Sequence, residues 1–109
     1  MALALNVFTT ITAIVDTTPT VIYTAPVGYT GVVLLAQVAN VGTTSEDVTF
    51  VHRRNLNDTR ILKQYPISSG DTANLLVGKL VLKSGDSLVL SGSDDNNLEF
   101  IASILETLN

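Results

Sequence analysis

Turn-forming residues recur at short intervals along these 109 residues, and this spacing limits the possible folds more than any other feature. Gly and Pro stand at positions such as Pro19, Pro26, Gly42, Gly70 and Gly85. Between them Thr, Val and Ile are abundant, and β-branched residues suit the pleated surface of a strand. No segment keeps an apolar period of 3.6 residues, and the intervals leave almost no room for a helix. The sequence therefore predicts an all-β protein.

The intervals between turn signals define about eight short strands. They span residues 3–15, 20–25, 31–41, 46–54, 60–67, 72–83 (narrowed at Gly78), 86–91 and 97–107. A chain of this length corresponds to one domain. Eight strands in one small domain imply two packed sheets. We therefore predict a single antiparallel β-sandwich, jelly-roll-like, over residues 1–109.

Alternation of apolar and polar residues assigns the core face of three strands. In segment 46–54, Val48 and Phe50 share a face with His52, whereas Asp47, Thr49 and Arg53 share the other. The corresponding core faces of the second and last strands are Val21, Tyr23 and Ala25, and Leu98, Phe100, Ala102 and Ile104.

Two segments are apolar on both faces, which a sandwich strand with one face in water does not need. Segment 32–35 reads Val-Val-Leu-Leu, and segment 75–82 carries Leu or Val at six of its eight positions. The connecting loops are too short to cover such faces, so we predict that another copy of the chain covers them. The candidate subunit-interface residues are Val33, Leu35, Leu75, Val77 and Val81.

Charge is sparse and unevenly placed. Charged residues make up 15% of the chain and the net charge is −4, which argues against a nucleic-acid partner. Basic side chains gather between His52 and Lys63, whereas the quarter after Lys83 has no Lys or Arg. These charges are either solvated loop residues or complementary patches that orient neighbouring subunits. On the second interpretation, Arg53 and Arg54 join the candidate interface.

No segment supports catalysis or cofactor binding. Gly85-Asp86-Ser87-Leu88 matches the motif of GDSL esterases, but no histidine follows it and His52 lies upstream in another strand, so we interpret it as a turn. Asp94-Asp95-Asn96-Asn97 lacks the ligand spacing of a calcium loop, and the chain has no cysteine. No apolar run approaches about 18 residues. We expect no enzyme activity, no cofactor, no metal site and no membrane partner.

Several segments, taken in order, resemble short virion structural proteins of tailed phages, especially those of marine and cyanobacterial phages. The segments that carry this resemblance are Val21–Thr30, Ala36–Asn40, Pro66–Asp71, Leu75–Leu82, Gly85–Leu88 and Ala102–Glu106. The resemblance implies a β-sandwich subunit without catalytic residues, placed on the capsid exterior as a decoration or in the neck or tail. Its implied partners are copies of itself and other virion proteins, and its implied location is the virion, assembled in the host cytoplasm.

A second hypothesis is a carbohydrate- or receptor-binding β-sandwich module. Such a module needs an exposed aromatic cluster on which a sugar can stack. The only tyrosines available for one are Tyr23, Tyr29 and Tyr65.

Overall fold

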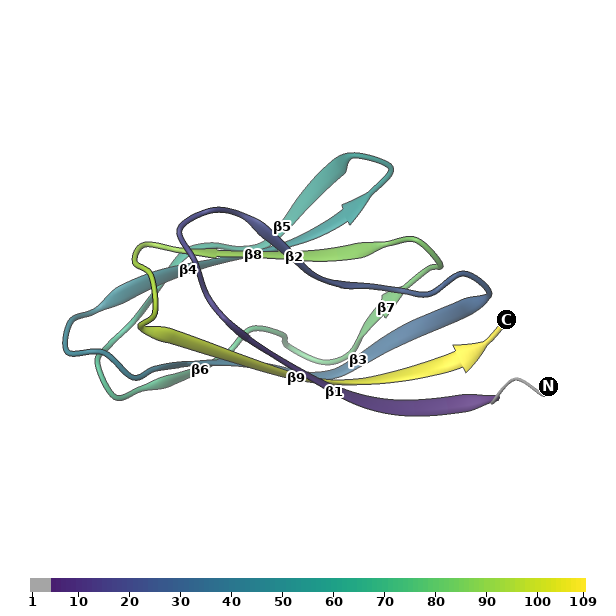
Figure 1. The fold of residues 1–109 in the computed structure, drawn as a ribbon, viewed down its shortest axis with the longest axis horizontal. Coiled ribbons are helices and arrows are strands. Elements are labelled where there is room, and N and C mark those ends of the chain that lie inside the picture. Colours follow the sequence, from purple (N-terminus) through teal and green to yellow (C-terminus); the bar gives the residue numbers. More distant parts are fainter. Residues whose placement is uncertain (1–4) are drawn as a thin grey trace.

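The chain folds into two antiparallel sheets packed face to face, in a computed structural model that describes residues 5–109 (Figure 1). Sheet A contains β1 (Asn6–Ile14), β3 (Tyr29–Asn40), β6 (Thr72–Asn74), β7 (Leu80–Leu82) and β9 (Leu98–Leu108). Sheet B contains β2 (Thr20–Thr24), β4 (Glu46–Arg54), β5 (Asn57–Ile67) and β8 (Ser87–Gly92).

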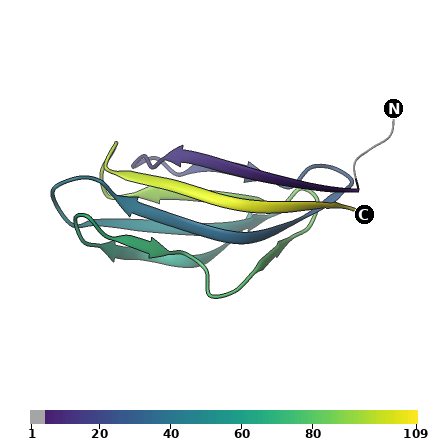
Figure 2. The same cartoon turned by 90° about the horizontal axis from the view of Figure 1, so that it is seen from below.

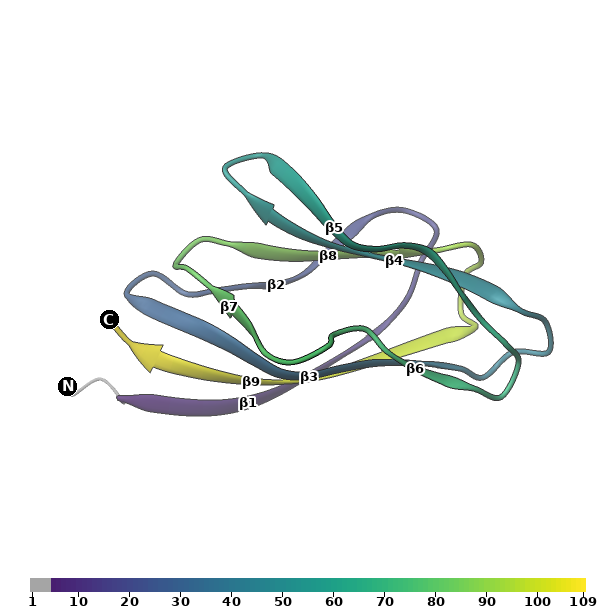
Figure 3. The same ribbon diagram turned by 180° about the vertical axis from the view of Figure 1, so that it is seen from behind.

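The strand order is that of a jelly roll. Sheet A runs β1-β9-β3-β6, with β7 also beside β3, and sheet B runs β2-β8-β4-β5. Figure 2 shows β1, β9 and β3 side by side across one layer, and Figure 3 shows β4, β5 and β8 in the other. When β6 and β7 are counted as one interrupted strand, each sheet contains four strands, in the order of two Greek keys. The predicted all-β sandwich with a jelly-roll-like topology is thus confirmed.

The core lies between the sheets and is built from alternate residues of each strand. The four residues predicted for the last strand, Leu98, Phe100, Ala102 and Ile104, are all buried. Val48 and Phe50 are buried opposite them, and the Phe50 and Phe100 rings pack with centroids 5.9 Å apart. Period-2 alternation therefore located most of the core correctly.

The prediction that Val21 of the second strand belongs to the core is wrong. A register shift between Val21 and Tyr23 marks a β-bulge in the pairing of β2 with β8. The extra residue moves Val21 to the outer face of sheet B, where 47% of it is exposed, while Ala25 stays buried. Tyr23 points inward, where its hydroxyl donates a hydrogen bond to Glu106 Oε2 at 2.5 Å. Burial and this bond raise the pKa of Tyr23.

Two predicted strands differ most from the observed ones, for local reasons. The predicted strand 72–83 is two strands, because the chain leaves the sheet after Asn74 and Gly78 adopts a φ of 94° before β7 begins. Strand β5 begins at Asn57 rather than residue 60, because Asn55 and Leu56 alone form the turn from β4. Residues 3 and 4 of the first predicted strand lie outside the described residues. Within residues 5–109 no helix is suited by length and apolarity to cross a bilayer.

The β4–β5 turn places a leucine in a backbone conformation that favours glycine. Asn55 and Leu56 have φ of 51° and 68°, and Leu56 is 92% exposed. A two-residue hairpin with positive φ at both positions prefers Asn-Gly, because a Cβ is crowded there. We expect Leu56→Gly to raise the free energy of unfolding by about 0.5–1 kcal/mol. Denaturant unfolding measures this, with Leu56→Ala as the matched control. An equal gain in Leu56→Ala would show that removal of the exposed side chain, not the backbone, is responsible.

Candidate subunit interface on the outer face of sheet A

The outer face of sheet A is apolar over most of its width. We call this surface the apolar face. Every strand of the sheet except β6 contributes to it. Its members are Phe8, Ile14, Val32, Leu34, Leu35, Val81, Ile101 and Leu105, which are exposed or half-buried.

Register places these side chains in contact rows across the sheet. Phe8 pairs with Leu105, Leu105 with Val32, and Val32 with Val81, so one row crosses β1, β9, β3 and β7. Directly opposite residues of neighbouring strands point to the same face. Phe8 is 76% exposed and Val81 57% exposed at the two ends of the row. The row is therefore a continuous apolar band rather than scattered surface residues.

A β-bulge in β3 sends two consecutive leucines outward. The pairing of β3 with β9 shifts register between Val33 and Leu35, so Leu34 is the extra residue. Leu34 and Leu35 are 37% and 39% exposed, whereas Val33 is fully buried in the core. The sequence prediction that Val33 and Leu35 share an exposed face is therefore wrong for Val33. The bulge, which alternation cannot anticipate, reverses the parity between them.

Of the other three apolar candidates, Val81 belongs to the apolar face. The backbone N–H of Leu75 donates to the carbonyl of Ala36 at 2.8 Å, and its side chain is 2% exposed. Leu75 is therefore a core residue, and its prediction as an interface residue is wrong. Val77 is fully exposed, but it lies in the loop between β6 and β7 rather than in a strand.

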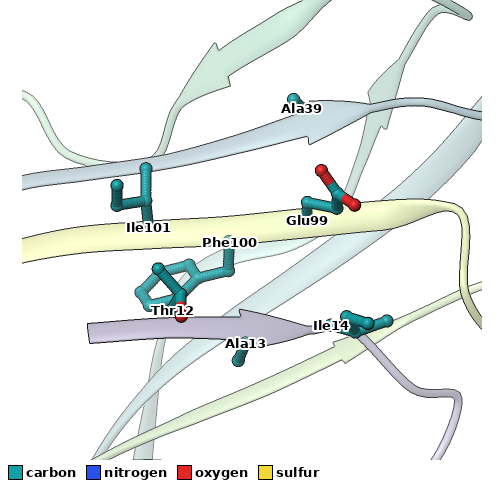
Figure 4. A pocket seen from close by; sticks show the side chains of 7 residues that line it. All are labelled: Thr12, Ala13, Ile14, Ala39, Glu99, Phe100 and Ile101. Atoms are coloured by element: carbon teal, nitrogen blue, oxygen red, sulfur yellow. The ribbon is translucent and has the colours of Figure 1, made fainter.

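The apolar face contains a shallow hollow near the end of β1. It has a volume of about 610 Å³, and Figure 4 shows the side chains around it. Glu99 is the single ionisable residue among those that line it. Its lining residues are Thr12, Ala13, Ile14, Ala39, Glu99, Phe100 and Ile101.

The outer face of sheet B is polar by comparison. Residues of β4 that point away from the core include Asp47, Thr49 and Arg53, as the alternation predicted. Val51 and Val89 also lie on this side, but neighbouring side chains bury both of them. The sandwich thus has one outer face suited to water and one suited to contact with another apolar surface.

Two arginines in the hairpin of β4 and β5 are paired with carboxylates of the same chain. Arg53 Nε donates to Asp58 Oδ1 at 2.7 Å, across the hairpin. Arg54 donates through Nε and Nη2 to both carboxylate oxygens of Asp86, at 2.9 and 2.7 Å. Both arginines named as interface candidates therefore hold contacts that stabilise the monomer itself. Reversing Arg54 to glutamate would place two carboxylates together and damage the fold.

Asp86 is the centre of this charged cluster. It is 2% exposed, and it accepts further hydrogen bonds from the Lys83 N–H at 2.9 Å and from His52 Nε2 at 3.0 Å. The bidentate contact with Arg54, followed by those with His52 and Lys83, holds the pKa of Asp86 well below its ordinary value, although burial opposes this. The carboxylate fixes the turn before β8 and ties it to β4.

The contacts of Asp86 give the esterase-like motif Gly85–Leu88 a structural role at the turn before β8. Ser87 lies next to Asp86, but its hydroxyl oxygen is 2.9 Å from that of Thr24. The ring of His52 is bonded to Asp86 rather than to Ser87. A serine nucleophile needs a base within hydrogen-bonding distance, and these contacts give Ser87 none. Gly85, with φ of 87°, occupies the turn as the sequence predicted.

Two further kinds of site that the sequence raised are a metal centre and an aromatic surface for sugar binding. No group of three or more His, Cys, Asp or Glu side chains among residues 5–109 could hold a metal ion. Tyr23, Tyr29 and Tyr65 belong to β2, β3 and β5, and Tyr23 is engaged with Glu106.

Outside segments 32–35 and 75–82, sequence reasoning missed four members of the apolar face: Phe8, Ile14, Ile101 and Leu105. In the last strand the residues that alternate with the four core positions point to the outer face. They include Ile101 and Leu105, so the same segment contained the signal for both faces. The first strand has the same pattern, with Phe8 and Ile14 in register with the exposed positions.

Comparisons with known proteins establish the fold. No protein-family model matches the sequence, and no curated protein is significantly similar to it. Among solved structures, the chain is similar to a structure of Bacillus endospore appendages, which form disulfide-linked pili. The TM-score is 0.58 and the identity is 18%, and the similarity covers 95% of this chain and 88% of that one. A weaker similarity, with a TM-score of 0.45 and 16% identity, is to a pentameric capsid protein isolated from metagenomic phage sequences. It covers 90% of this chain and 60% of that one, so this chain spans less than two thirds of the capsid protein's length. At these identities the first similarity shows a shared fold and nothing further.

Proposed function

We propose that this protein is a non-enzymatic structural subunit of a tailed-phage virion that associates with copies of itself through the apolar face. Its place is the capsid exterior, as a decoration, or the neck or tail. The virion, assembled in the host cytoplasm, is its location, and other virion proteins are its further partners.

The apolar face carries this proposal. Burying one valine, leucine, isoleucine or phenylalanine contributes roughly 1.5–3 kcal/mol, and eight such side chains point outward from one sheet. Among the described outward-facing strand residues of that sheet, only Glu99 is charged. An outer sheet face of this composition is costly in water and stabilising once covered. A structural subunit that packs against other subunits needs such an apolar surface and does not need a reactive group.

The shared fold is compatible with the proposal, and the sequence sets one condition on it. The jelly roll also occurs in the pilus protein described above, which forms a disulfide-linked polymer. These 109 residues contain no cysteine, so disulfides between them cannot hold an assembly together. Burial of the apolar face is the main source of non-covalent contacts in the proposed assembly.

Purified phage particles test the proposal. We expect peptides of this chain in particles that have been banded by density and washed with high salt, because apolar contacts survive high salt while surface ion pairs weaken. A tail- or capsid-specific location would then follow from particle imaging with an antibody against the chain. Absence of the chain from intact, infectious particles would overturn the virion assignment.

A further inference from the structure

We propose that two copies of this protein pair through the free edge of β1, antiparallel and about a two-fold axis, to join their A sheets into one. This inference rests on the proposed self-association, but it concerns the strand edge rather than the apolar face. It names the partner strand, the register and the residue that lies on the two-fold axis.

Strand β1 ends sheet A, and among the sheet edges formed by residues 5–109 it is the one left unprotected. Natural proteins blunt edge strands with proline, charge, bulges or short length. Strand β1 keeps one unbroken register with β9 over all nine of its residues. It contains no proline, no glycine and no charged side chain. Nothing in the strand itself opposes the addition of another strand.

The other sheet edges all carry such protection. On sheet B, β2 has five residues, contains a bulge and lies between Pro19 and Pro26. Strand β5 includes Pro66, two basic residues and Gln64 at a φ of 51°. At the far edge of sheet A, β6 and β7 have three residues each. A nine-residue partner strand is therefore available only from the β1 of a second copy.

Hydrogen bonds at the two ends of β1 show which of its backbone groups are free to pair. The Leu108 N–H donates to the Leu5 carbonyl at 2.8 Å, and the Val15 N–H to the Leu98 carbonyl at 2.9 Å. Both bonds join residues directly opposite each other in the β1–β9 register. Opposite pairs alternate between bonded and unbonded in an antiparallel ladder. Odd-numbered residues of β1 are therefore bonded to β9, and even-numbered residues, including Phe8, Thr10 and Thr12, direct their N–H and C=O groups to the open edge.

The register between the two β1 strands follows from their full overlap. Full overlap of two antiparallel β1 strands places Thr10 opposite Thr10 of the second copy, and Phe8 opposite Thr12. Even residues then meet even residues, which gives about ten new main-chain hydrogen bonds. No like charges oppose one another, and Thr–Thr pairs are favourable across strands. The five-stranded sheets become one ten-stranded sheet, and the two apolar faces become continuous on the same side.

Cysteine scanning tests this pairing, because the natural chain has no cysteine. In the proposed register the two Thr10 Cα atoms lie about 5.5 Å apart, within the range of a disulfide. The two Thr12 Cα atoms lie about 14 Å apart, since four residues separate them along the strand. Two sheets stacked face to face would hold any such pair about 10 Å apart, beyond disulfide reach. Thr10→Cys and Thr12→Cys are matched, because both replace a threonine on the exposed face of β1.

We expect oxidised Thr10→Cys to run as a covalent dimer in non-reducing electrophoresis, at least tenfold more abundant than the dimer of Thr12→Cys. Equal crosslinking of the two variants, or no crosslinking of Thr10→Cys, would overturn the β1 pairing. The mass of the wild-type protein in solution separates this outcome from failure of the proposed function. A wild-type oligomer without the Thr10 crosslink retains self-association and rejects the edge, whereas a wild-type monomer rejects both.

Discussion

Asp86→Ala is expected to lower the free energy of unfolding by roughly 2–3 kcal/mol. The variant removes the buried acceptor of Arg54, His52 and the Lys83 N–H at once. The His52 ring and the Lys83 N–H would then lack the partner that compensates their loss of water. Chemical denaturation of the monomer measures the change. Asp58→Ala is the matched control, because it removes the same group from a half-exposed pair with Arg53. An equal loss in both variants would contradict the central role of Asp86.

The Asp86 carboxylate also makes the stability of the fold depend on pH in the acid range. The pKa of Asp86 is lower in the folded chain than in the unfolded chain, mainly because of the Arg54 contact. Its contribution to stability is therefore complete above the unfolded value of about 3.9. It is lost progressively as the pH falls from there through the folded value. We expect the stability of Asp86→Ala to vary less with pH below 4 than that of the wild type, as measured by thermal unfolding.

The double variant Val81→Lys/Ile101→Lys is expected to weaken self-association by about 100-fold or more. The two side chains are 57% and 40% exposed on the apolar face, in strands β7 and β9. Each loses apolar burial at the interface and brings a charge that must be desolvated there. Sedimentation velocity over a range of concentrations measures the association, and circular dichroism verifies that the variant is folded.

Val21→Lys/Val27→Lys is the control for this change. It also places two lysines at exposed valines, one on the outer face of sheet B and one in the turn between β2 and β3. We expect its association to match that of the wild type. Equal weakening in both double variants would mean that added charge, rather than the apolar face, accounts for the effect.

The sequence predicted the fold because its information is local and periodic. Turn residues bounded most strands, and alternation in segment 97–107 identified four buried residues. It failed where a single extra residue changes parity. The bulge at Leu34 moved Val33 into the core, and the bulge between Val21 and Tyr23 moved Val21 out. Bulges arise from pairing with a neighbouring strand, so no pattern within one strand reveals them.

The candidate interface was predicted in part for related reasons. Leu35 and Val81 lie on the apolar face, whereas Leu75 turns into the core where the chain leaves the sheet before Gly78. The sequence does not reveal that Arg53 and Arg54 are both paired with carboxylates of the same chain. Asp58 lies across the hairpin, and Asp86 is separated from Arg54 by 32 residues. Such pairings depend on the folded topology rather than on sequence spacing.

Sedimentation equilibrium of the wild-type protein tests most directly the claim that the apolar face is covered by another copy. Coverage of the apolar face by another copy predicts a mass that rises with concentration to a multiple of the 11.6 kDa of the chain. It also predicts that the mass persists in high salt, because burial of apolar side chains is not screened as charge pairs are. A mass of 11.6 kDa throughout, up to high micromolar concentration and in both low and high salt, would contradict it.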